Sequence, residues 1–189
     1  MRGIVSNGLL GAGALALIVV APALAAERIV PSWLTFDEAK NTVKIEIVAA
    51  YNGNNGSWNF NGYSEGGMTV VIPLGAKVRI DFKNPDGNYP HSLIVSQPFA
   101  PDAFPNDAGR EQVGIPRAYS SDPREGCLAC TDSLRFKAKK PGVFHLLCGV
   151  AGHAQAGMWD HFTVSAEAKA PYVTIADDAL GPEDQPGYP

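Results

Sequence analysis

One stretch of the chain decides its fold: Phe144-His145-Leu146-Leu147-Cys148-Gly149-Val150-Ala151-Gly152-His153-Ala154-Gln155-Ala156-Gly157-Met158-Trp159. Apolar residues before Cys148 and after Met158 predict two strands. The small residues between them predict a tight loop, because glycine tolerates sharp bends. This loop offers a thiol, an imidazole and a thioether in the order Cys-x4-His-x4-Met. The stretch therefore predicts a strand–loop–strand unit with a metal-binding loop at one end.

The chemistry of these side chains favours copper. A thiolate and two imidazoles bind copper in both oxidation states, and a weak axial thioether tunes its potential. The second imidazole is His91, which follows Pro90 at the start of another predicted strand. The predicted ligands are His91, Cys148, His153 and Met158. Each has a plainer alternative: a turn histidine, a buried core thiol, a surface histidine and a core methionine, respectively.

The other two histidines are not predicted ligands. His145 lies three residues before Cys148, which places it on the opposite face of the strand. It is interpreted as a structural or exposed residue. His161 is expected at the surface.

Alternating and apolar runs predict seven to eight short strands with almost no helix, so the fold class is all-β, a β-sandwich or small barrel. The predicted strands are 43–47, 68–72, 77–83, 92–95, 134–137, 143–148 and 159–164. Residues 97–132 contain five prolines and no sustained alternation. A loop this long is unusual inside a domain, so it is interpreted as an insertion.

The N-terminal segment predicts targeting to the outside of the cytoplasm. Arg2, an apolar run and Ala23-Leu24-Ala25 resemble a signal peptide over residues 1–25, with an uncleaved anchor as the alternative. The domain is then 26–166, and 167–189 is a Pro-rich acidic tail, expected to be extended or disordered. The predicted location is secreted, periplasmic or on the outer face of the cytoplasmic membrane.

Three cysteines are an odd number for such a compartment. Cys127 and Cys130 are close enough in sequence to pair, and a structural disulfide is the favoured interpretation. A role in copper loading or redox sensing is the alternative. This pairing leaves Cys148 free for a metal.

Two blocks of the sequence resemble the cupredoxins, and more narrowly the sulfocyanins. The first is Asn59-Phe60-Asn61-Gly62 with the later Ile72-Pro73-x-Gly75-x-x-Val78, and the second is the loop from Phe144 to Trp159. The resemblance covers about residues 43–164. It implies a Greek-key β-sandwich with one type 1 copper ion, and Ser92 beside His91 is expected to hydrogen-bond across to the ligand loop.

The implied role is one-electron transfer outside the cytoplasm in a respiratory chain, with cytochromes or a terminal oxidase as partners and no enzyme activity. The net charge of −4 argues against nucleic acid. A membrane contact would come only through the N-terminal anchor. Two other functions stay open. A nitrosocyanin-like copper enzyme would use a carboxylate ligand such as Glu65 or Asp160, and a copper delivery or storage protein would be richer in methionine or histidine.

Overall fold

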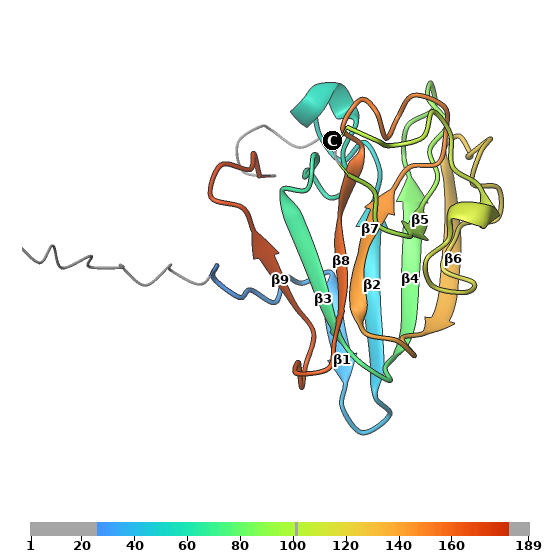
Figure 1. Cartoon of the computed structure of the whole chain (residues 1–189). Helices are drawn as coiled ribbons and strands as arrows, with labels where there is room; N and C mark the ends of the chain where they lie inside the picture. The colour runs from blue at the N-terminus through green and yellow to red at the C-terminus, as the bar shows by residue number, and fades with distance from the viewer. Residues whose placement is uncertain (1–25, 101, 182–189) are drawn as a thin grey trace, which may run out of the picture.

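The computed structural model describes residues 26–100 and 102–181, which form two β-sheets packed face to face (Figure 1). One sheet has the order β1-β2-β4-β6 and the other β5-β7-β8-β3-β9. The strands are β1 (Leu34–Asp37), β2 (Thr42–Val48), β3 (Met68–Pro73), β4 (Lys77–Asn84), β5 (Ile94–Ser96), β6 (Cys130–Lys137), β7 (Gly142–Leu147), β8 (Trp159–Ser165) and β9 (Tyr172–Ile175). Two short 3-10 turns, η1 (Asn54–Ser57) and η2 (Arg110–Gln112), complete the described elements.

The first sheet follows directly from its alternating sequence. In β4, Val78, Ile80 and Phe82 are buried, while the residues between them face solvent or are half-buried. The neighbouring β2 runs parallel to β4 and buries its own alternate residues in the same core. Ion pairs such as Lys83–Glu46 (2.7 Å) line the outer face. The period of two therefore decides which face of this sheet enters the core.

The second sheet carries the chemistry. β7 and β8 are antiparallel neighbours, and their register pairs Leu147 with Trp159. Phe144 and Leu146 point into the core between the sheets, as do Phe162 and Val164. The chain leaves β7 at Cys148 and enters β8 after Met158, so the loop between them lies at one end of the sandwich.

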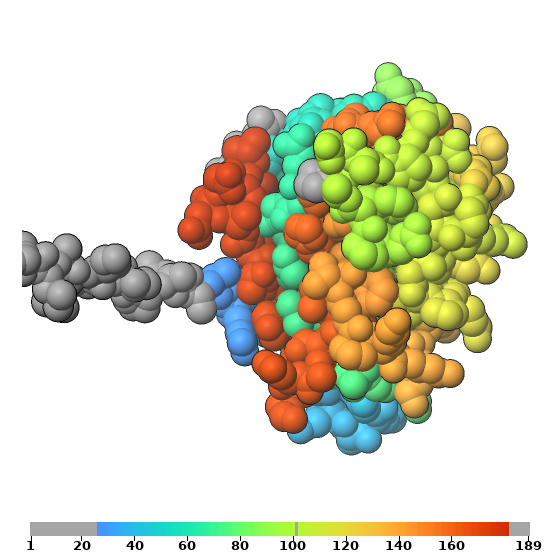
Figure 2. All heavy atoms as spheres, viewed as in Figure 1, coloured from blue at the N-terminus to red at the C-terminus, as the bar shows by residue number. Residues whose placement is uncertain are grey.

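The outer face of β7 and β8 is covered near the loop that joins them by residues from the segment 97–132 (Figure 2). Phe104, Ala108 and Trp159 form a small second core there with Ile94, Leu147 and Ala154. The segment is mostly loop, with η2 inside it and β6 beginning at Cys130. It is therefore packed against the sheet over part of its length. That it is an insertion remains a prediction.

The all-β sandwich prediction is confirmed, and each of the seven predicted strands has a counterpart. The structure adds β1 and β9. Residues 172–175 belong to the segment predicted to be an extended or disordered tail, and they are extended and pair with β3 as β9. The domain boundaries at 26–166 and the rest of the tail stay predictions. The predicted signal segment 1–25 lies outside the described residues, and no described helix is long and apolar enough to span a membrane.

His145 and His161 lie opposite each other on β7 and β8, with ring centroids 5.2 Å apart. His145 is 4% exposed, and its Nδ1 accepts the Phe99 N–H at 3.3 Å. Its interpretation as a structural residue fits this position. His161, which was expected at the surface, is half-buried, and its buried Nδ1 lacks a hydrogen-bond partner among the described residues.

We expect this histidine pair to weaken the fold in mild acid. Burial, and then repulsion from His161, lower the pKa of His145 from 6.5 to about 4. Between pH 6.5 and about pH 4, His145 is protonated in the unfolded chain but stays neutral in the folded chain. The free energy of unfolding therefore falls as the pH falls. The effect of His145 is at most about 3 kcal/mol. Urea unfolding of the metal-free protein at pH 7 and pH 4.5 measures it.

The matched variant is His145→Gln, which keeps an acceptor for Phe99 but does not titrate in this range. It should lose less stability than the wild type over the same pH interval. Equal losses for both proteins would show that His145 is not the group responsible.

Candidate metal centre

The four predicted ligands come from two parts of the chain, the β7–β8 loop and the segment before β5, which meet at one end of the sandwich. Cys148 directly follows β7, and Met158 directly precedes β8. His153 lies in the loop between them, drawn in orange at the top of Figure 1. His91 lies just before β5, where its backbone pairs with Cys127.

The structure brings His91, Cys148 and His153 together. One ligand atom from each lies within 4.8 Å of the others, and in the described part of the chain this is the only such group of three or more histidine, cysteine or acidic residues. All three are buried, with exposed fractions of 1%, 1% and 8%. Their spacing fits ligands around one ion.

The histidines of this cluster are prepared to bind a metal. Neither ring nitrogen of His91 has a hydrogen-bond partner among the described residues, although both are buried. Leaving such polar atoms unpaired costs about 1–3 kcal/mol each unless a ligand takes them. Burial lowers the pKa of both His91 and His153 to about 4, and His153 adds to the shift at His91. Both imidazoles are therefore neutral near pH 7, as metal binding requires.

The Cys148 sulfur lies in a shell of donors. Its Sγ accepts the Ser92 N–H at 3.4 Å and lies 3.4 Å from His153 Nδ1. Burial raises the pKa of the Cys148 thiol, while the Ser92 hydrogen bond opposes that shift. A nearby cation is what removes the proton from such a buried thiol. The pocket therefore suits a thiolate that is bound to a metal.

Ser92 connects the segment that carries His91 to the loop that carries Cys148 and His153. Its Oγ accepts the Gly149 N–H at 2.9 Å and donates to the Pro123 carbonyl at 2.6 Å. The predicted hydrogen bond from Ser92 to the ligand loop is confirmed. Ser92 thereby fixes His91, its chain neighbour, against the residue that follows Cys148.

The ligand loop is closed by its own backbone. The Cys148 N–H donates to the Met158 carbonyl at 3.1 Å, and the Met158 N–H donates to the His153 carbonyl at 3.0 Å. Gly157 has φ of 94°, a left-handed conformation that favours glycine. Met158 is fully buried, and these contacts place its backbone beside Cys148 and His153.

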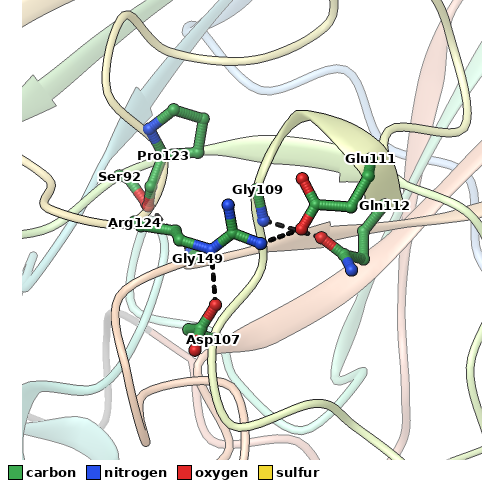
Figure 3. A network of polar contacts seen from close by, with 8 residues as sticks. All are labelled: Ser92, Asp107, Gly109, Glu111, Gln112, Pro123, Arg124 and Gly149. Carbon is green, nitrogen blue, oxygen red and sulfur yellow. Dashed lines mark hydrogen bonds and ion pairs between the residues drawn. The ribbon is translucent and has the colours of Figure 1, made fainter.

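A layer of loops holds this arrangement from outside. Arg124 forms ion pairs with Asp107 and Glu111, next to Pro123, which accepts the Ser92 hydroxyl (Figure 3). The Cys127–Cys130 disulfide is present, as predicted. Cys127 exchanges two backbone hydrogen bonds with His91, at 3.2 and 3.0 Å. The disulfide loop thus supports the backbone of His91.

Two features of the site were not predicted from the sequence. Trp58 packs on His153 with ring centroids 4.2 Å apart, and the Asn84 side chain donates to the Cys127 carbonyl at 2.6 Å. Trp58 directly precedes the Asn59 to Gly62 block that carried the family resemblance. Its position beside that block could have indicated a role near the site. Asn84 carried no signal, because it only ends a strand.

The carboxylates considered as alternative ligands lie outside the three-residue cluster. Asp160 is fully buried, and its Oδ1 accepts the Met68 N–H at 2.9 Å. Burial raises the pKa of Asp160 well above its usual value. Such a carboxyl is poorly suited to bind a metal as an anion.

Comparison with known proteins identifies the family. The family model for the sulfocyanin (SoxE) domain matches residues 31–175. The chain belongs to the sulfocyanin family. The sulfocyanin of Sulfolobus acidocaldarius is 29% identical over 146 residues, which cover 74% of this chain and 72% of that protein.

Among solved structures, a rusticyanin is similar with a TM-score of 0.48 and 18% identity, covering 74% of this chain and 87% of its own. Auracyanin A, a blue copper protein of Chloroflexus aurantiacus, is similar with a TM-score of 0.47 and 19% identity, covering 66% and 99% of the two chains.

Family membership settles the class of the cofactor and of the activity. The predicted cofactor, one type 1 copper ion, is confirmed by the family together with the cluster of His91, Cys148 and His153. Like the other members of the family, the protein is an electron carrier and not an enzyme. The nitrosocyanin-like alternative is therefore not retained.

Proposed function

We propose that this protein carries single electrons in a respiratory chain outside the cytoplasm, using a copper ion bound by His91, Cys148, His153 and Met158. The observation that supports this most is the buried cluster in which both His91 nitrogens lack a hydrogen-bond partner among the described residues. Two neutral imidazoles and one thiolate are the ligands that hold copper in both oxidation states with little rearrangement. Small rearrangement is what makes one-electron transfer fast.

Met158 completes the proposed ligand set as the weak axial donor. Its side chain is fully buried among core residues that include Cys148. Its backbone is hydrogen-bonded to both Cys148 and His153. The backbone of Met158 therefore lies beside those of two of the other proposed ligands. The role of the thioether is to tune the potential rather than to hold the ion.

Replacing Met158 with Leu should raise the reduction potential and keep the protein blue. Leucine has nearly the same volume but donates no electrons, so Cu(II) loses more stabilisation than Cu(I). Voltammetry of the copper-loaded variant measures the shift. The matched control is Met68→Leu, a change of the same kind at another fully buried methionine. If both variants keep the wild-type potential, Met158 is not the axial ligand.

The proposed location and partners rest on the sequence and the family. The predicted signal segment and the disulfide both suit an oxidising compartment outside the cytoplasm. Cytochromes and a terminal oxidase are the proposed redox partners. The net charge of −4 would favour a basic contact surface on them.

The respiratory role can be tested with membranes of the source organism. Reduced, copper-loaded protein is mixed with membranes in air, and the return of the blue colour is followed. We expect oxidation at a rate proportional to the amount of membrane and blocked by cyanide, an inhibitor of terminal oxidases. Oxidation no faster than in buffer would contradict the respiratory role, while leaving the copper site itself to be judged by its spectrum.

A further inference from the structure

The copper ligands are shielded from solvent, so an electron must cross protein to reach them. The exposed fractions of His91, Cys148 and Met158 are 1% or less, and that of His153 is 8%. The large side chain that lies against both histidines is Trp58. Its ring centroid is 4.2 Å from that of His153 and 5.7 Å from that of His91.

The contacts of Trp58 continue outward to the surface. Its ring meets Tyr89 edge to face with centroids 5.4 Å apart, and Tyr89 is 55% exposed. Trp58 is itself half-buried and lines a groove with His91, Tyr51 and Tyr89. The rings of His153, Trp58 and Tyr89 therefore form an unbroken series from the cluster to the groove.

The chain holds Trp58 in place with unusual backbone geometry. Asn55 and Gly56, just before it, have φ of 50° and 61°. The Asn55 side chain donates to the carbonyls of both Trp58 (3.0 Å) and Ala156 (2.8 Å). Because Ala156 belongs to the ligand loop, this one amide joins the Trp58 turn to the copper loop. Asparagine and glycine adopt this left-handed conformation more readily than other residues, so the sequence suits the turn before Trp58.

We propose that Trp58 conducts the electron between the two histidine rings and a redox partner bound at the groove. In this step Cu(I) becomes Cu(II), and one electron arrives at the acceptor. No bond forms or breaks, no proton moves, and Trp58 is not oxidised. Electron tunnelling through packed rings is faster than across a gap, so removing the indole should slow transfer. The inference rests on the proposed copper ligands.

The test is the rate of electron self-exchange between two copies, measured by NMR line broadening when oxidised protein is added to reduced protein. Trp58→Leu should slow exchange about tenfold, equivalent to about 1.4 kcal/mol. Its visible spectrum and reduction potential should stay at the wild-type values. Trp58→Phe, which keeps an aromatic ring, should recover most of the rate. Trp33→Leu, at a half-buried tryptophan with no ring contact to the histidines, is the matched control and should exchange normally.

Three results would overturn the proposal. Wild-type or faster exchange in Trp58→Leu would mean that the indole only shields the site. Equal slowing in Trp58→Phe and Trp58→Leu would remove the role of the ring. A changed spectrum or potential in both variants would make Trp58 a purely structural support of the copper site. If instead the wild-type protein shows no blue copper, it is the proposed function that fails, and this experiment distinguishes the two.

Discussion

Replacing Cys148 with Ser is expected to abolish the blue absorption band completely and to stop electron transfer. The intense colour of a type 1 site arises from charge transfer between thiolate sulfur and Cu(II), and Cys148 is the one free cysteine. A hydroxyl at this buried position is a harder and much weaker donor. The visible spectrum and the self-exchange rate after copper loading measure both losses.

The fold should survive this change, which separates loss of chemistry from loss of structure. Serine is close to cysteine in size, and the Ser92 N–H can donate to oxygen as it does to sulfur. Circular dichroism and urea unfolding of the metal-free variant should stay near the wild type. A Cys148→Ser variant that remained blue would exclude Cys148 as the copper ligand.

Replacing Gly149 with Ala should destabilise the protein strongly and disorder the copper loop. An added Cβ would collide with the carbonyl oxygen of Ala108 and would lie 2.6 Å from that of Pro123. Backbone atoms cannot move aside cheaply, so the Gly149 N–H would be pulled from the Ser92 hydroxyl. Overpacking costs about 1–3 kcal/mol, and the lost hydrogen bond adds about 1 kcal/mol. Urea unfolding of the metal-free protein measures the loss.

Gly87→Ala is the matched control, because an added Cβ there has no neighbour within 4 Å. Its stability should stay within about 0.5 kcal/mol of the wild type. The copper-loaded Gly149→Ala protein should also show a weakened or altered blue band. Equal stability of the two variants would mean that the crowded contacts of Gly149 are not as tight as described.

The sequence predicted the fold wherever a strand buries one face. β4 alternates over its whole length, and its buried apolar residues Val78, Ile80 and Phe82 were evident from the pattern. β9 could not be predicted in the same way, because it has only four residues in a Pro-rich acidic segment. What stabilises β9 is pairing with β3, a contact between positions about a hundred residues apart in the sequence. Such pairing leaves no local signal.

The site divides in the same way. Cys148, His153 and Met158 share one loop, so their spacing alone indicated that they bind one metal ion. His91 reaches them only through β5 and its backbone pair with Cys127, and only the family resemblance connected it to the loop. Trp58 comes from a third part of the chain. Its contact with His153 depends on the left-handed turn at Asn55 and Gly56, which periodicity does not predict.

The visible spectrum of the copper-loaded, oxidised wild-type protein tests the central claim most directly. One copper ion held by the His91, Cys148 and His153 cluster, with Met158 on the axis, predicts an intense blue band at a stoichiometry of one copper per chain. The band should vanish on reduction and return on reoxidation. A chain that binds Cu(II) but stays colourless would contradict the type 1 centre and the electron-carrier function built on it.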